Sequence, residues 1–363
     1  MTLQSSGSIS LGDIANTFGY TLLPSAGTRI GDYQKVKGGN KPFSHSLGDL
    51  QFNTIDGGNS VPRTGQIKFS DFYGTQLQQV VNFWESGRGG FRLIARDRYE
   101  TDNGTNGNVT VVGGYRDRPS DSSGTKVHIH VKQDIGSEAN DPDHCALRTG
   151  DQWESGTNLQ IDVGSGGRII GAGGQGGDGP DQAGAGSQGG FGSSALGVQY
   201  SNTQLNVSSG ALISCGFGGG GGGGGAFDYD HKSSRHAGGG RGGGGAGLPM
   251  GQPADEGTNN GQSATAAQSM TEGGEGGGGG TNHHESTGGN GGAGGDIENA
   301  TQNGGYGSGN ENGQQNAFGP AGQDGFTFKK TSGITFGNSE ISAASGTVFH
   351  GNRGAGLIGD GVQ

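Results

Sequence analysis

Four acidic residues in the second half of the chain are of the type that glycoside hydrolysis needs. Cleavage of a glycosidic bond uses two carboxyl groups that flank the bond, and Asp228, Asp230, Asp255 and Glu256 could supply such a pair. Acidic residues in loops are more often simply solvated, and the sequence predicts no groove scaffold, such as a β-helix, that would hold a sugar chain. The pattern therefore disfavours a hydrolase, and we predict that the chain is not an enzyme.

His128 and His130 are the residues best suited to a metal ion, because residues two apart in a strand lie on the same face. No third ligand follows at a telling spacing, so a solvated or cross-strand face is favoured. The chain has no phosphate loop ending in Gly-Lys-Ser/Thr and no His-Glu-x-x-His motif. Gly171-x-Gly173-x-x-Gly176 matches the dinucleotide fingerprint, as chance predicts in so glycine-rich a run. We expect no catalytic residue, no cofactor and no metal.

The best candidates for a binding site are polar and aromatic residues that interrupt runs of glycine. Aromatic rings can anchor a partner while charged side chains set specificity, and histidine could make binding sensitive to pH. Ordinary solvated turns are an equally open interpretation of these loops. The predicted contact residues are Phe227, Asp228, Tyr229, Asp230, His231, Lys232, Arg235, His236, His283 and His284.

The stretch that must position these residues runs from 216 to 247, two glycine runs around a polar insert. Glycine loses more backbone freedom on ordering than any other residue, so an isolated run is a coil. Packed side by side as extended helices with three residues per turn, such runs can pair every N–H and C=O with neighbours. Glycine here is segregated from the inserts, whereas flexible linkers are monotonous in Gly and Ser. The pattern favours a bundle of polyglycine type II helices, with further runs near 164–192, 273–280, 288–295 and 304–325.

The rest of the chain predicts a mainly β fold with extensive non-regular structure. Residues 1–79 are interpreted as a small N-terminal module, because the pattern apolar-x-apolar-x-Asp-apolar occurs there three times. Ser10 and Ser46 are predicted helix N-caps, with an Asp three residues later. Residues 80–163 predict a β sandwich, followed by the polyglycine-helix domain over 164–325 and a closing β segment over 326–363. The predicted strands of the sandwich are 80–84, 91–95, 108–112, 126–131 and 158–163.

Composition bounds the partners of the 363-residue chain. A net charge of −11 disfavours nucleic acid bound through a broad basic surface. Only 27% of the residues are hydrophobic, which is too few for one large core. No secretory signal is visible, and no apolar stretch approaches the roughly 18 residues that membrane insertion requires. Cys145 and Cys215 are too few for a disulfide scaffold, and a single bridge between them is left open.

Several of these segments resemble known phage proteins. The glycine runs with polar and aromatic inserts resemble the adhesins at the tip of T-even phage long tail fibres, and Cys145-Ala-Leu-Arg-Thr-Gly-Asp-Gln-Trp followed by Gly167-Arg-Ile-Ile-Gly is similar to the glycine-rich end of phage tail-tip proteins. Residues 1–13 and 65–74 resemble the start of cyanophage-type virion structural proteins.

The resemblance implies a receptor-binding protein of the virion, located at a phage tail fibre or tail tip. Its loops would bind a bacterial cell-surface receptor, protein or glycan, and its N-terminal module would bind other tail or fibre proteins, with a homo-oligomer left open. A competing interpretation is a purely structural virion component, a spacer or baseplate part without host contact. A third is a disordered linker.

Overall fold

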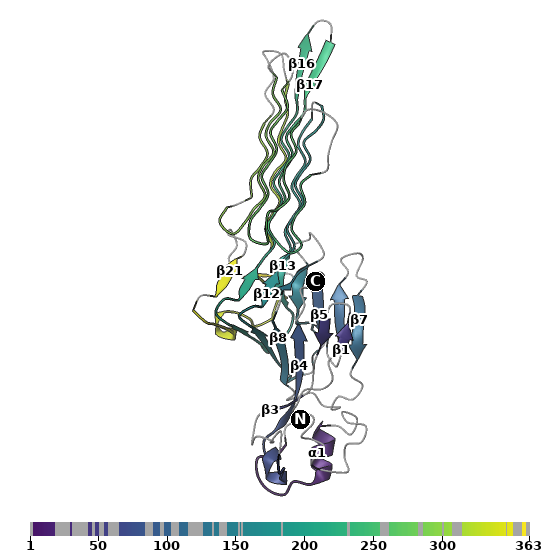
Figure 1. Ribbon diagram of the computed structural model, residues 1–363, viewed down its shortest axis with the longest axis vertical. Helices are drawn as coiled ribbons and strands as arrows, with labels where there is room; N and C mark the ends of the chain where they lie inside the picture. Colours follow the sequence, from purple (N-terminus) through teal and green to yellow (C-terminus); the bar gives the residue numbers. More distant parts are fainter. Residues whose placement is uncertain are drawn as a thin grey trace.

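The protein is elongated, with a small N-terminal module, a central layer of β-sheets and a long glycine-rich region that ends in a hairpin (Figure 1). No helix among the residues described is long and apolar enough to cross a membrane. The computed structural model describes residues 3–18, 30, 43–45, 48–50, 54–56, 65–83, 90–94, 98–102, 109–114, 126–132, 134–137, 144–151, 153, 155–182, 184–230, 233–254, 261–281, 286–299, 301–306, 314–345, 347–350 and 358–360.

The N-terminal module contains helix α1 (Leu11–Phe18), which begins directly after Ser10. The hydroxyl of Ser10 accepts a hydrogen bond from the backbone N–H of Asp13 (3.1 Å), and the Asp13 carboxylate accepts one from the N–H of Ser10 (2.8 Å). These reciprocal bonds satisfy two otherwise unpaired donors at the helix start, so the predicted cap at Ser10 is confirmed. The same Asp-to-backbone bond precedes the 3₁₀ helix at Phe69–Phe72.

The middle copy of the threefold pattern folds differently. It forms the antiparallel pair β1 (Phe43–His45) and β2 (Gly48–Leu50), so the helical turn predicted there is wrong. Asp49 stands opposite Ser44 in this ladder, which shows that a shared pattern of apolar residues does not fix the local conformation. The predicted cap Ser46 lies outside the described residues.

The central part of the molecule has three β-sheets, and the chain passes through all three of them in each of several successive circuits. Each circuit contributes one strand to each sheet, and strands of successive circuits pair in parallel and in register. Such an architecture is a β-solenoid, in which each repeat contacts only its neighbours. The circuits are β8 (Lys126–Val131), β9 (Asp134–Ile135) and β10 (Cys145–Arg148); β11 (Asn158–Val163), β12 (Arg168–Ile170) and β13 (Ser194–Val198); β14 (Thr203–Val207), β15 (Leu212–Ser214) and β19 (Phe328–Lys330); and β20 (Ile341–Ala343), β21 (Val348–His350) and β22 (Ile358–Asp360).

Earlier strands extend two of these sheets. β4 (Gln76–Phe83) runs parallel to β8, and β5 (Gly90–Ile94) runs parallel to β10. Further toward the edges the pairing becomes antiparallel. One more strand, β3, pairs with β4, and two more, β6 and β7, follow β5 as an antiparallel meander. The remaining strands of these edges are β3 (Thr54–Asp56), β6 (Arg98–Asp102) and β7 (Val109–Gly114).

The predicted strands are present at 76–83, 90–94, 109–114, 126–131 and 158–163, and the fold is mainly β. The β sandwich predicted for 80–163 is not confirmed, because strand 158–163 pairs in parallel with 203–207, which in turn pairs in parallel with 341–343. Alternation of apolar residues reports which side chains face a core but not which strand lies alongside. In β11 the apolar residues Leu159, Ile161 and Val163 are fully buried, and together with their equivalents in the neighbouring circuits they fill the solenoid.

The glycine region leaves the solenoid from a single corner. Residues 171–193 connect β12 to β13, and residues 215–327 connect β15 to β19, so both excursions start and end between the same two sheets. The chain runs outward and back several times as extended segments that lie side by side (Figure 1). We call the end next to the solenoid the base and the opposite end the tip. The tip carries β16 (Ala226–Asp230), β17 (Ser233–Ala237) and β18 (Gln314–Gln315).

Hydrogen bonds of the run 216–225 change direction with every residue and repeat every third residue. One set of N–H groups donates to 184–193, the next to 240–246 and the third to 302–305; for example, Gly220 N lies 2.9 Å from Gly243 O. A repeat of three residues is that of an extended helix with three residues per turn. The carbonyls of the same run accept from three further segments, 174–177, 289–295 and 319–325.

Close contact with so many neighbours explains why this run is almost pure glycine. A Cβ on Gly220 would lie 2.0 Å from the carbonyl oxygen of Gly292, and a Cβ on Gly242 would lie 1.9 Å from that of Gly220. Runs at the surface of the region need glycine less often. In 171–180 the exposed residues Gln175 and Asp178 are three apart, with glycines at the buried positions between them. Glycine content therefore follows the number of sides on which a run is covered.

Side chains at the surface of the region replace backbone partners that a further segment would supply. The Asp324 carboxylate accepts from the N–H of Gly218 (2.9 Å) and from the hydroxyl of Thr301 (3.0 Å). Gly218 is buried, so its N–H needs such a partner. Other side chains that accept from the backbone of a neighbouring segment are Ser187, Ser193, Thr265, Asn290 and Asn303.

Replacing Asp324 by alanine should destabilise the protein by about 1–3 kcal/mol, because it leaves the buried N–H of Gly218 without an acceptor. Asp324→Asn keeps an oxygen at the accepting position and serves as the matched control. Thermal unfolding of the two variants measures the difference. A melting temperature of Asp324→Ala equal to that of the wild type, or of Asp324→Asn as low as that of Asp324→Ala, would contradict the role of this hydrogen bond.

The two cysteines are buried and free, so the bridge that the sequence left open is not formed. Burial raises the pKa of the Cys215 thiol well above its ordinary value, and the negative charge of Asp324 raises it further. Cys215 packs with Phe217 and Ala246 where the glycine region joins the solenoid. It acts there as a small apolar residue.

Candidate functional site

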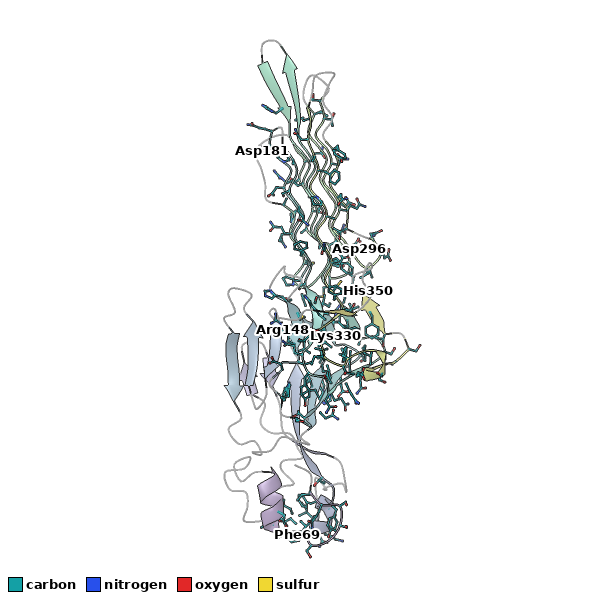
Figure 2. All side chains as sticks on the ribbon, turned by 180° about the vertical axis from the view of Figure 1, so that it is seen from behind. Phe69, Arg148, Asp181, Asp296, Lys330 and His350 are labelled. Carbon is teal, nitrogen blue, oxygen red and sulfur yellow. The ribbon has the colours of Figure 1, made fainter. Side chains whose placement is uncertain are left out.

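The tip brings together segments that are far apart in the sequence. Gly225 N donates to Gly184 O (2.9 Å), Gly224 N to Gly305 O (3.0 Å), and Gly280 N to Gly238 O (2.9 Å). The ends of the segments that run outward therefore lie side by side at the tip. Figure 2 shows the same order, with Asp181 close to the tip and Asp296 close to the base. Residues at the turns that follow these ends share one surface of the molecule.

The predicted binding insert 227–237 is a β-hairpin at the tip. β16 and β17 pair antiparallel, with Phe227 opposite His236, Asp228 opposite Arg235 and Asp230 opposite Ser233. β18 adds a third strand through Ala226 and Phe227. The hairpin joins 216–225 directly to 238–247, and both runs are buried along their whole length. It is thus held by the two most enclosed segments of the glycine region.

Several other predicted site residues lie in parts of the chain that the structure does not describe. His231 and Lys232 fall between β16 and β17, outside the described residues, as do His283 and His284. The latter pair is bracketed by Thr281 and Thr287, which form an isolated antiparallel bridge. Because Gly280 N also bonds to Gly238 O, both predicted binding segments start from the tip.

The structure describes only some of the residues that were considered for chemistry. Asp228 and Asp230 are in β16, whereas Asp255 and Glu256 lie outside the described residues. His130 lies on an outer face of the solenoid, with Nδ1 3.5 Å from the carboxylate of Asp162 on the neighbouring strand. Within the described ranges no three His, Cys, Asp or Glu side chains are grouped as a metal site would need.

An aromatic pair near the tip, with one ring exposed and the other partly buried, was not predicted from the sequence. The ring of Tyr306 packs edge to face on that of Phe318, with centroids 4.7 Å apart and an interplanar angle of 86°. Tyr306 is 64% exposed, the highest value among the large apolar side chains described. The signal in the sequence was that both aromatic residues interrupt glycine-rich segments, one on each side of 307–313.

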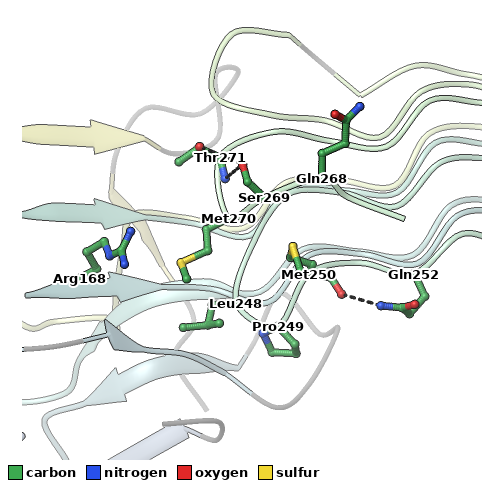
Figure 3. A pocket seen from close by; sticks show the side chains of 9 residues that line it. All are labelled: Arg168, Leu248, Pro249, Met250, Gln252, Gln268, Ser269, Met270 and Thr271. Atoms are coloured by element: carbon green, nitrogen blue, oxygen red, sulfur yellow. Dashed lines mark hydrogen bonds between the residues drawn. The ribbon is translucent and has the colours of Figure 1, made fainter. Parts of the chain in front are cut away.

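A pocket of about 470 Å³ lies at the base, between the solenoid and two turns of the glycine region (Figure 3). Its edge is formed by Arg168, whose Nε and Nη2 donate to the carboxylate of Asp134 at 2.6 and 2.7 Å. The rest of the lining is mixed: Leu248, Pro249, Met250 and Met270 are apolar, and Gln252, Gln268, Ser269 and Thr271 are polar. The N–H of Ser137 donates to the carbonyl of Leu248 (2.9 Å), which fixes one of these turns on the solenoid. The pocket is at the opposite end of the glycine region from the hairpin.

Comparison with known proteins adds one finding. The family model described as phage tail fibre adhesin Gp38 matches residues 99–361, which include the solenoid circuits and the whole glycine region. No curated protein and no solved structure gave a significant match. Since the family match spans most of the chain, the protein belongs to the phage tail fibre adhesin family Gp38, and it is a component of the virion tail.

Proposed function

We propose that this adhesin binds a receptor on the bacterial surface through the tip of its glycine region, and that the glycine segments are polyglycine type II helices. The hydrogen-bond repeat of three residues supports the helix type, since it is the repeat of an extended helix with three residues per turn. The observation that carries the binding role is the position of the hairpin 226–237, which extends past the glycine segments at the end farthest from the N-terminal module (Figure 1).

The arrangement separates a fixed frame from replaceable contacts. The frame is held mainly by backbone hydrogen bonds between glycine-rich segments, so it does not require the particular side chains of the hairpin. Binding residues are commonly found on loops above a rigid scaffold. In the hairpin, directly opposed residues share a face, so positions 227 and 236 form one surface and positions 228 and 235 the other. We propose Phe227 and Tyr229 as anchors and Asp228, Asp230, Lys232 and Arg235 as determinants of polar specificity.

The opposite end of the molecule serves attachment in this proposal. The N-terminal module, residues 1–79, lies outside the family match and farthest from the tip. We propose that it binds other tail or fibre proteins. The protein then acts by binding rather than by catalysis, and His283 and His284 form a second candidate contact.

Antibody fragments separate this function from that of a purely structural spacer. A Fab against 227–237 should prevent adsorption of the phage, whereas a Fab against the base turn 248–252 should not, although both bind intact particles. Because the two Fabs have the same size, the comparison shows whether adsorption is blocked by covering the tip or by the bulk of any bound Fab. Adsorption that is unaffected by the Fab at the hairpin would support the spacer and contradict the adhesin.

A further inference from the structure

Two adjacent segments near the tip form a face that the receptor proposal does not use. Segment 301–306 runs outward and segment 316–325 runs back, joined by the bond from Gly304 N to Gly319 O (3.0 Å). Two contacts cross between them: Tyr306 packs on Phe318, and the Asn303 side chain accepts from Ala321 N (2.7 Å). We call Asn303, Tyr306, Phe318 and Ala321 the aromatic face.

The spacing within each segment places these contacts on one side. Asn303 and Tyr306 are three residues apart, as are Phe318 and Ala321, and the hydrogen bonds of the glycine region repeat every third residue. With a rise of about 3.1 Å per residue, the two contacts are about 9 Å apart along the segment. Asn303 and Tyr306 are both exposed. An open ring and an amide are thus held at a fixed separation on a rigid support.

The two segments that form this face carry acceptors and amides but no positive charge. Between 288 and 325 the sequence contains no Lys, Arg or His, whereas Asp296, Glu298, Glu311 and Asp324 are acidic. An anionic ligand such as a phosphorylated sugar would find no cation within these segments to pair with. Gln302, exposed beside Asn303, adds a further donor and acceptor. Neutral hydroxyl groups match this set of side chains.

A protein partner fits the face less well. Protein interfaces bury about 800 Å² on each side, with several aromatic or apolar anchors gathered near the centre. Among the described residues, the exposed large apolar side chains are Phe69, Met250 and Tyr306, and they lie in different parts of the molecule. A single ring beside amides is enough for one sugar residue, whose C–H groups can pack on the ring while its hydroxyls bond to the amides.

We propose that the aromatic face binds a neutral saccharide of the host surface, with Tyr306 as the stacking platform and Asn303 as a hydrogen-bonding partner. Phe318 is a positioning residue, because it touches the ring of Tyr306 and limits its rotation. This inference rests on the proposed adhesin function and names a ligand class for a second part of the same tip.

The test uses the full chain and whole host cells, together with polysaccharide released from those cells. Tyr306→Ala should weaken binding of the free polysaccharide about tenfold, as loss of one aromatic contact implies. Tyr306→Trp keeps a stacking surface and should retain binding. Met250→Ala, which removes the exposed apolar side chain at the base, is the matched control and should bind like the wild type. Equal melting temperatures of the variants show that the fold is intact.

Treatment of the cells distinguishes the possible failures. Periodate oxidation of surface sugars should reduce binding of the wild type, and protease treatment should leave the contribution of Tyr306 unchanged. Binding that protease abolishes and periodate does not affect would overturn the saccharide but leave the adhesin function standing. Equal binding of polysaccharide by Tyr306→Ala and wild type would also overturn it. No binding of wild type to any treated or untreated cells would instead contradict the proposed function itself.

Discussion

Gly220→Ala is expected to destabilise the protein by at least about 3 kcal/mol, or to prevent its folding. The added Cβ would lie 2.0 Å from the carbonyl oxygen of Gly292 and 2.5 Å from its carbonyl carbon. Both atoms belong to a backbone that hydrogen bonds hold in place on several sides, so neither can move without breaking other bonds. Thermal unfolding measures the effect, which should lower the melting temperature by several degrees or more.

Gly278→Ala is the matched control because it makes the same chemical change in another glycine run. Its Cβ would meet only the side chain of Gln262, whose Oε1 lies 2.7 Å away and can turn aside. This variant should therefore unfold at nearly the wild-type temperature. If Gly220→Ala also melted within about one degree of the wild type, the close packing of the interior runs would be refuted.

Simultaneous replacement of Phe227 and Tyr229 by alanine is expected to slow adsorption to host cells by roughly thirtyfold or more, as loss of interface anchors worth about 2 kcal/mol implies. Particles should still assemble, because both residues belong to the hairpin at the tip and the frame beneath it is held by glycine backbone bonds. Counting free phage after mixing with cells measures the rate.

The control for this prediction removes two apolar side chains at the base, Met250 and Met270, which line the pocket beside Arg168. That double variant should adsorb at the wild-type rate. Unchanged adsorption of the Phe227 and Tyr229 variant, with full incorporation of the protein into particles, would remove the hairpin from the binding site.

The glycine pattern was the most informative part of the sequence. Segregated glycine runs predicted extended segments that pair their backbone N–H and C=O groups with one another. The hydrogen bonds from 216–225 to its neighbours support that interpretation. The spacing of Gln175 and Asp178 also indicates a glycine run at the surface of the region, because only every third residue there faces solvent. A side chain is tolerated only where no neighbouring backbone occupies its place. The glycine content of a segment therefore indicates on how many sides other segments cover it.

The architecture of the β layer could not be obtained in the same way. Strands such as 158–163 were evident from alternation, but alternation is identical in a sandwich and in a solenoid. The difference lies in pairing between 158–163, 203–207 and 341–343, which are separated by the whole glycine region. Strand propensity contains no information on such distant partners.

The candidate site was only partly accessible from sequence. Residues 227–236 were conspicuous because they interrupt long glycine runs, and the structure places that insert at the tip. Tyr306 and Phe318 were not singled out, since neither stands in an insert rich in charge. Their contact depends on two antiparallel segments lying at the same level, which only the packing order of the glycine region determines.

Hydrogen–deuterium exchange across 216–225 and 238–247 tests the central claim most directly. Most of these amides donate hydrogen bonds to neighbouring segments, and both runs are buried, so we predict protection comparable to that of the solenoid strand β11. Exchange of both runs at the rate of an unstructured peptide would contradict the ordered frame, and with it the proposal that a rigid glycine region carries the binding surface.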